Sequence, residues 1–324
     1  MSLKKIIDVK SVNTLIKNQI INREGVRLID CSYALAPRAD WKKFEKEQYG
    51  KFENLPESPS RNLYLSAHIP EAIHIDLDVA MYPSKYQRFA HYPVEIFEKY
   101  AQILGLNSGE HFIFYGKGAF GGMLFASKIA WLFRTYGQEK VSLVDGGFDA
   151  WKRENFEISK EEVTLERGNW KGKDELSQHV ITFEELETKD SSDKQMIERS
   201  SEYNFLDSRG RGQFNGTEDT GLDPNKVNGT RIPGFKNVPS AELMQKPGVL
   251  RPEAEIKEWL STNGYNSSLP TITSCNSGVQ AALLAYVMDS TLPESKPRLF
   301  NGSLKEVENR DPKKISDGPQ HLPN

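Results

Sequence analysis

The sequence predicts an α/β protein built from two tandem domains of similar architecture, each a mostly parallel sheet with helices on both faces. Short apolar strands alternate with helical segments along the chain, which is typical of a parallel sheet covered on both sides. The chain has 324 residues, enough for roughly two domains. Landmarks of the first half recur in the second half in the same order.

Four paired segments make up this tandem repeat. The pairs are 26–30 with 203–207, 67–72 with 230–235, 111–136 with 269–288, and 141–147 with 297–303. Ile69 precedes Gly116 by 47 residues, and Ile232 precedes Cys275 by 43 residues. Four landmarks in one order with similar spacing indicate two copies of one domain.

The repeat also suggests where the domains begin and end. We expect an N-terminal domain over 1–157, a linker over 158–177, a C-terminal domain over 178–311 and a tail over 312–324. The linker is charged and poor in aliphatic residues, so we expect an exposed tether. Helices are expected over 94–104 and 252–263, and the first copy carries an insertion between Ser32 and Ala67.

Composition excludes several classes of protein. The formal net charge is −3, which argues against a broad nucleic-acid surface. Two cysteines and six scattered histidines leave no disulfide framework and make a metal site unexpected. No apolar run reaches the roughly 18 residues of a membrane span, and the N-terminus lacks the pattern of a signal peptide. We therefore expect a cytoplasmic protein with no membrane partner, no nucleic-acid partner and no metal or other cofactor.

Cys275 is the candidate nucleophile. The β-branched run Thr271–Thr273 predicts a buried strand, and the apolar run Ala281–Met288 predicts a buried helix. A thiolate at the turn between them would be stabilised by backbone N–H groups and the helix dipole, so its pKa should fall. The alternative is a small buried side chain at a tight turn. The first copy has Gly116 at this place, so only the second copy can supply the nucleophile, while the first copy helps to form the site.

Two other enzyme classes fit less well. Residues 116–121 match Gly-x-Gly-x-x-Gly, and Asp145 follows at the end of the next predicted strand, as in dinucleotide-binding enzymes. The repeat already explains these glycines, because they align with the Cys275 loop. A phosphatase with a Cys-x₅-Arg loop would need an arginine where Ala281 stands.

Taken together, these landmarks resemble the rhodanese family in its two-domain form. The matching motifs are 206–209 (Leu-Asp-Ser-Arg), 214–218 (Phe-x-Gly-Thr-Glu), 231–234 (Arg-Ile-Pro-Gly), 275–279, 68–70 (His-Ile-Pro) and 143–151. The resemblance implies a sulfurtransferase without a cofactor. Sulfane sulfur would pass from a small-molecule donor, 3-mercaptopyruvate or thiosulfate, through a Cys275 persulfide to cyanide or a thiol, such as a thioredoxin-like protein.

The loop after the cysteine is similar to the 3-mercaptopyruvate branch of the family. That branch has a serine two residues after the cysteine and no positively charged residue in the loop. This sequence likewise has Ser277 at that position and no cation in the loop. By the same resemblance, Ser277, His91 and Asp78 would form a serine–histidine–acid relay. The loop residues around the transferred sulfur would be Asn276, Gly278, Val279 and Gln280, with N–H groups turned inward at the flexible Gly278.

Other positions depart from the family. Gln213 stands where the family has an arginine that grips the donor's acid group, and a second arginine after the Gly-Thr-Glu motif is absent. Arg209 and Arg211 are the nearest candidates to contact the donor, although Arg209 matches a family arginine that is usually structural. The alternative function is therefore a catalytically weakened paralogue that acts in binding or regulation.

Overall fold

The computed structural model describes residues 3–53, 58–219 and 227–317. Contacts divide the chain into two units. The first unit comprises Met1–Tyr82, His91–Glu175 and Met244–Leu250, and the second comprises Pro83–Ala90, Leu176–Leu243 and Arg251–Asn324. Among the described residues, no helix is long and apolar enough to cross a membrane.

The first unit is built on a five-stranded sheet in the order β1-β5-β4-β2-β3. Its strands are β1 (Ile6–Ile7), β2 (Val26–Asp30), β3 (Ile73–His74), β4 (His111–Tyr115) and β5 (Val141–Val144). All four neighbouring pairs are parallel. Apolar and β-branched residues predominate in these strands, and every residue of β2 and β4 is buried, as expected for a sheet covered on both faces.

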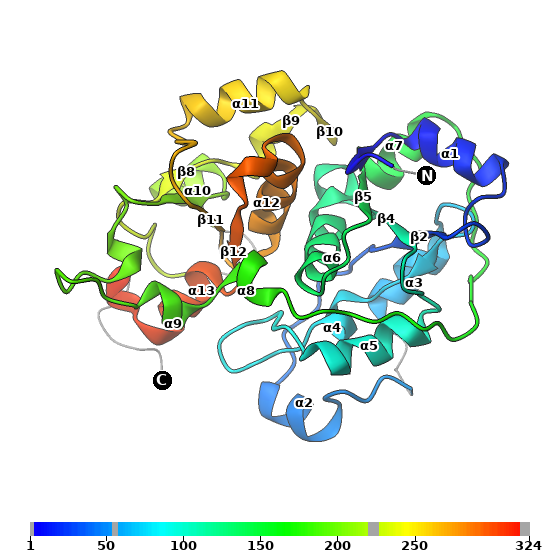
Figure 1. Ribbon diagram of the computed structural model, residues 1–324, viewed down its shortest axis with the longest axis horizontal. Coiled ribbons are helices and arrows are strands. Elements are labelled where there is room, and N and C mark those ends of the chain that lie inside the picture. Colours follow the sequence, from blue (N-terminus) through cyan, green and yellow to red (C-terminus); the bar gives the residue numbers. More distant parts are fainter. Residues whose placement is uncertain (1–2, 54–57, 220–226, 318–324) are drawn as a thin grey trace. The chain divides into compact units, whose positions relative to one another are not determined.

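Helices cover both faces of this sheet (Figure 1). The helices of the first unit are α1 (Val9–Lys17), α2 (Trp41–Glu47), α3 (Pro59–Ser66), α4 (Leu77–Ala80), α5 (Val94–Ile103), α6 (Met123–Thr135), α7 (Gly147–Arg153) and the 3-10 helix η1 (Ala119–Gly122). Side chains of α1 and α7 pack on β2 and β4 in one core cluster. On α6, Phe133 contacts Phe112 and Phe114 of β4 and Phe97 of α5, so α5 and α6 cover the other face.

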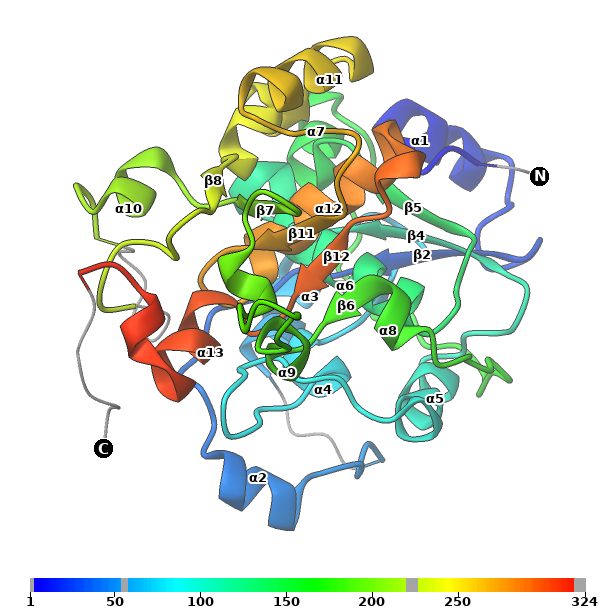
Figure 2. The same ribbon diagram turned by 60° about the vertical axis from the view of Figure 1, so that its left-hand side comes forward.

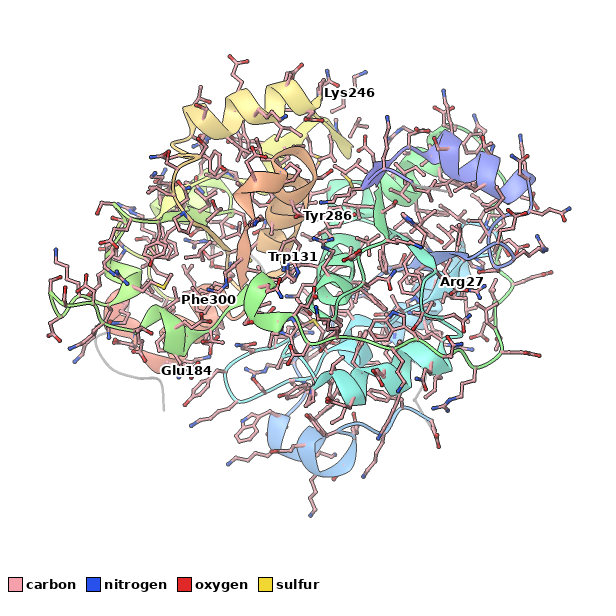
Figure 3. All side chains as sticks on the ribbon, viewed as in Figure 1. Arg27, Trp131, Glu184, Lys246, Tyr286 and Phe300 are labelled. Carbon is pink, nitrogen blue, oxygen red and sulfur yellow. The ribbon has the colours of Figure 1, made fainter. Side chains whose placement is uncertain are left out.

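The second unit repeats this topology. Its sheet has the order β6-β12-β11-β7-β8, again with parallel pairs throughout. The strands are β6 (Val180–Ile181), β7 (Asn204–Asp207), β8 (Lys236–Asn237), β11 (Thr271–Ser274) and β12 (Arg298–Phe300). Phe300, labelled in Figure 3, packs with residues of α9 and α13 on one face, while α12 contacts β11 and β12.

The helices of the second unit occur in the same succession. They are α8 (Leu176–His179), α9 (Phe183–Leu186), α10 (Arg211–Asn215), α11 (Glu253–Thr262), α12 (Val279–Thr291), α13 (Ser303–Arg310), and the 3-10 helices η2 (Met196–Glu198), η3 (Ser240–Leu243), η4 (Pro293–Ser295) and η5 (Pro312–Lys314). The observed bounds of α5 and α11 confirm the helices expected over 94–104 and 252–263. The two parallel sheets confirm the predicted fold class.

Each unit also includes a short segment from the other half of the chain. The antiparallel pair β9 (Met244–Lys246) and β10 (Val249–Leu250) belongs to the first unit, and Pro83–Ala90 belongs to the second. In the first unit, the Leu250 N–H donates to Asp145 Oδ1 at 3.0 Å. The domain boundaries expected from the sequence assign each unit one continuous half of the chain and do not include this exchange.

The segment that joins the two halves is largely exposed, as expected, but it is anchored and is not a free tether. Trp170 is 1% exposed, its indole N–H donates to Gln138 Oε1 at 3.0 Å, and its ring packs on Phe97 and Phe133. The backbone N–H of Trp170 also donates to the Leu106 carbonyl at 3.0 Å. Together with backbone bonds from Ser159 to His68 and from Gly168 to Gln102, this buried indole fixes the otherwise charged segment to the first unit.

Candidate active site at Cys275

Cys275 lies at the carboxyl end of β11, a strand that pairs with β12 on one side and β7 on the other (Figure 2). In sheets of this kind, ligands bind beyond the carboxyl ends of the strands. The side chain of Cys275 is 2% exposed. The predicted strand, turn and helix are confirmed: β11 ends at Ser274, and the 13-residue helix α12 begins at Val279.

The loop directs a backbone N–H group at the sulfur. The Gly278 N–H donates to Cys275 Sγ at 3.1 Å, immediately before the first turn of α12. Gly278 has φ of 76°, in the left-handed region that favours glycine. A Cβ built on Gly278 would lie 2.2 Å from the Asn301 carbonyl oxygen. Glycine is therefore required at this position both for its backbone conformation and for its close contact with residue 301.

The residues after β12 hold the backbone of Cys275 in place. The Cys275 N–H donates to Ser303 Oγ at 3.0 Å, and the Ser303 hydroxyl donates to the Phe300 carbonyl at 2.7 Å. The Leu304 N–H donates to the Cys275 carbonyl at 3.1 Å. Ser303 is fully buried and has φ of 51°, which is uncommon for a residue with a side chain.

Sequence reasoning missed Asn301 and Ser303 as site residues. The weak match between 141–147 and 297–303 was the available signal, because Ser303 takes the place of Gly147, which has φ of 45°. A serine at this position keeps the left-handed backbone conformation. It also adds a hydroxyl oxygen that accepts the hydrogen bond from the Cys275 N–H.

The other predicted loop residues surround this turn. Asn276 Oδ1 is buried and has no hydrogen-bond partner among the residues that the structure describes. Val279 is buried as the first residue of α12, whereas Ser277 and Gln280 are partly exposed. The Ser240 hydroxyl donates to the Gln280 carbonyl at 2.9 Å. Polar groups of Asn276, Ser277 and Gln280 thus belong to one loop that carries no charged side chain.

The two predicted relay partners of Ser277 belong to the first unit. Asp78 lies in α4 and accepts a hydrogen bond from the Tyr33 hydroxyl at 2.9 Å. His91 follows the exchanged segment Pro83–Ala90. Burial, followed by the nearby charge of Lys128, lowers the pKa of His91 to about 3, so its imidazole is neutral at physiological pH. The relay itself remains a prediction.

The arginines nearest to the missing family arginine already have partners. Arg209 is 1% exposed; its Nε and Nη2 bond both Asp207 carboxylate oxygens, and Nη2 also donates to the Thr230 carbonyl at 2.7 Å. Arg211 forms a two-pronged ion pair with Glu242, each N–O distance being 2.6 Å. Gln213 lies on the same short helix, α10. These bonds engage Nε and Nη2 of Arg209 within the second unit, so this guanidinium group is not assigned to donor binding.

Cys31 belongs to the first unit, directly after β2. Cys31 is 2% exposed, and burial, with a contribution from Asp30, raises the pKa of its thiol. In the described part of the chain, no group of three or more histidine, cysteine or acidic side chains could hold a metal ion.

Comparison with known proteins identifies the family of the chain. The profile of rhodanese-like domains matches residues 17–154. The chain is 68% identical, over the full length of both proteins, to mpst-1 of Caenorhabditis elegans, which is provisionally named a thiosulfate sulfurtransferase. The chain belongs to the rhodanese family. It is also 28% identical to human 3-mercaptopyruvate sulfurtransferase, over 70% of this chain and 74% of the human protein.

Solved structures show the same rhodanese fold. SseA, a 3-mercaptopyruvate sulfurtransferase of Escherichia coli, matches with a TM-score of 0.69 and 23% identity, over 93% of this chain and 99% of SseA. Tum1 of Saccharomyces cerevisiae matches with a TM-score of 0.73 and 18% identity, over 98% of this chain and all of Tum1. Within this rhodanese, the profile match covers the first copy, in which Gly116 replaces the cysteine.

Proposed function

We propose that the protein is a sulfurtransferase that carries sulfane sulfur on Cys275. The observation that carries this proposal is the Gly278 N–H directed at Cys275 Sγ, 3.1 Å away, at the start of α12. An N–H donor and the positive end of a helix stabilise negative charge on sulfur, in the thiolate and on the outer atom of a persulfide. The sulfurtransferase names of the relatives, in two donor classes, support the same reaction type.

The reaction has two balanced steps. In the first, the Cys275 thiolate attacks the outer sulfur of the donor, forming a sulfur–sulfur bond and a persulfide anion. The bond between that sulfur and the rest of the donor breaks, and its electron pair leaves with the remainder: sulfite from thiosulfate, or a pyruvate carbanion equivalent that takes up a proton. In the second, an acceptor thiolate attacks the outer sulfur and receives it, and the Cys275 thiolate returns.

We assign 3-mercaptopyruvate as the preferred donor. Thiosulfate is a compact dianion that calls for cations beside the cysteine, whereas Asn276, Ser277 and Gln280 are all neutral. The departing carbon of 3-mercaptopyruvate needs a proton. Ser277, His91 and Asp78 are proposed to move the thiol proton of the donor to this carbon: Ser277 gives its hydroxyl proton to the carbon, neutral His91 returns its own N–H proton to Ser277 and takes up the thiol proton, and Asp78 orients the imidazole.

The acceptor and the location are proposed on chemical grounds. The persulfide is released to a thiol, for which a thioredoxin-like protein or a small thiol is suitable, or to cyanide. Only two cysteines in 324 residues suit a reducing compartment, so we propose that the protein acts in the cytoplasm.

A second candidate is a catalytically weakened paralogue that binds a ligand or partner. The observations that favour it are Gln213 in place of the family arginine and the involvement of Arg209 and Arg211 in bonds within the second unit. The retained N–H–sulfur contact at Cys275 favours the enzyme.

One experiment separates the two candidates. Purified full-length protein is given 3-mercaptopyruvate or thiosulfate with a thiol acceptor, and sulfide release is followed. Mass spectrometry of the donor-treated protein then locates the added sulfur. An active enzyme gains one sulfur atom on the Cys275 peptide, and the Cys275→Ser variant releases no sulfide. Turnover that survives Cys275→Ser, or sulfur carried on Cys31, would overturn the proposed function.

A further inference from the structure

The first unit has a cavity at the carboxyl edge of its own sheet. Its volume is about 490 Å³, and it lies between the end of α3, the loop after β4 and helix α7. Its walls include Tyr33, Leu63, Ser66, Lys117, Phe148 and Lys152. In the repeat, Lys117 takes the place of Asn276, so a cation here replaces a neutral residue of the Cys275 loop. All residues described as lining the cavity belong to the first unit, whereas the Cys275 loop belongs to the second.

Two lysines in the wall of this cavity place their ammonium groups near one aromatic ring. Lys117 Nζ lies 5.0 Å from the centroid of the Phe148 ring, and Lys152 Nζ lies 5.5 Å from the same centroid. Lys117 is held in place by donation to the Leu63 carbonyl and, at 3.5 Å, to the Ser66 hydroxyl. Neither of these acceptors carries a formal charge.

The charges in the cavity wall favour an anion. The only carboxylate among the residues described as lining the cavity is Asp149, which pairs with Lys152 at 3.3 Å. Burial is the largest cause that lowers the pKa of Lys117; the charge of Asp30 raises it, and the smaller effect of the Lys152 charge lowers it. Among the residues described as lining the cavity, Lys117 and Lys152 against Asp149 leave one net positive charge, which attracts an anion.

We propose that this cavity binds a small oxyanion, of the size and charge of sulfate, sulfite or phosphate. Lys117 is the fixed contact, since its ammonium group is already oriented by Leu63 and Ser66. Lys152, which is half exposed, completes the site from the surface of α7. A Cβ built on Gly118 would meet no atom within 4 Å, so the loop leaves room beside Lys117. The site needs no sulfur transfer and does not depend on the proposed reaction.

Amine labelling of the full-length protein tests the proposal. Lys117 and Lys152 are acylated with a limiting reagent, and the labelled peptides are quantified by mass spectrometry with sulfate, phosphate or sulfite present. Sodium chloride at matched ionic strength controls for screening, and Lys257, which pairs with Glu253 in the second unit, is the control lysine. We expect each oxyanion to slow labelling of Lys117 in a saturable way, with no change at Lys257.

The Lys152→Gln variant makes the test specific. Lys152 is exposed on its helix, so the variant should fold normally. Losing one charged contact should weaken the protection of Lys117 about tenfold. Protection by chloride equal to that by sulfate, or unchanged protection in Lys152→Gln, would overturn the proposal. Comparison of the three oxyanions shows which of them the site prefers.

Discussion

Asn301 donates a hydrogen bond from its side-chain amide to the Phe89 carbonyl, at a distance of 2.6 Å. The same nitrogen lies 2.8 Å from Gln87 Oε1. The backbone carbonyl of Asn301 lies against Gly278, whose N–H bonds Cys275 Sγ. One residue thus connects the exchanged segment Pro83–Ala90 to the nucleophile loop within the second unit.

At the position after β5, the first unit has an acidic side chain, whereas the second unit has an amide at the matching position after β12. Asp145, the counterpart of Asn301, accepts the Leu250 N–H from its own exchanged segment. Asn301 instead donates to a carbonyl, which a carboxylate cannot do. The identity of the side chain after the last strand of each repeat therefore matches the backbone group that it meets.

Asn301→Asp should disturb the exchanged segment without changing the size of the side chain. The new carboxylate cannot donate to Phe89, so we expect a loss of about 1–3 kcal/mol in the free energy of unfolding. We also expect a lower kcat with little change in KM, and faster hydrogen exchange in 83–90. Acidic pH should restore part of the stability, because a protonated carboxyl group can donate again. A variant as stable as the wild type at neutral pH would contradict the role given to Asn301.

Gly278→Ala should weaken both folding and chemistry. The added Cβ would meet the Asn301 carbonyl at 2.2 Å, in a backbone with φ of 76°. We expect an unfolding free energy lower by about 1–3 kcal/mol and slower alkylation of Cys275, since the N–H donor must move. Gly25→Ala is the matched control, because Gly25 has φ of 70° and nothing within 4 Å of its Cβ position. Equal losses in both variants would mean that the contact with Asn301 has no separate effect.

The second half expressed alone should be an incomplete unit. A fragment from Leu176 lacks Pro83–Ala90, which provides partners for side chains that include Asn301, Glu306 and Arg310. Asn301 loses Phe89, and Arg310 loses the Tyr86 ring, 4.8 Å from its guanidinium carbon. We expect poor solubility, a less cooperative urea transition and little turnover. A soluble fragment with wild-type activity would contradict the need for the exchanged segment.

The fold and the setting of Cys275 between a strand and a helix could be predicted from the sequence because both leave local signals. Periodic apolar strands, the repeated order of motifs and a cysteine between a strand and a helix are visible without tertiary contacts. Asn301, Ser303 and the exchange of segments are defined by contacts between residues far apart in the chain. The anchoring of the link was missed for a related reason: Trp170, Ser159 and Gly168 find their partners far away along the chain.

Two histidines with lowered pKa values should make stability depend on acid pH. The pKa of His91 is lowered to about 3, chiefly by burial, and that of His111 to about 4 for the same main reason. The unfolded chain binds protons to both near pH 6.5, so it holds more protons than the folded state below that pH. The free energy of unfolding should therefore fall as pH falls from about 6.5 toward 4. Urea unfolding of wild type and His111→Gln over this range checks the slope, which should be shallower in the variant; an unchanged slope would contradict the assignment.

Restoring the family arginine should show whether its loss limits the binding of the sulfur donor. Gln213 occupies α10, where the family places an arginine, and Arg209 is held by Asp207. A guanidinium can bond a carboxylate with two parallel N–H groups, and such a charge-assisted contact contributes about 1.5–3 kcal/mol. Gln213→Arg should therefore lower KM for 3-mercaptopyruvate by about tenfold or more. Gln213→Lys is the control, because it adds the charge without the two-pronged geometry and should give a smaller effect. Equal effects would indicate that charge alone matters, and efficient thiosulfate turnover by the unmodified protein would show that the donor preference inferred from its neutral loop is wrong.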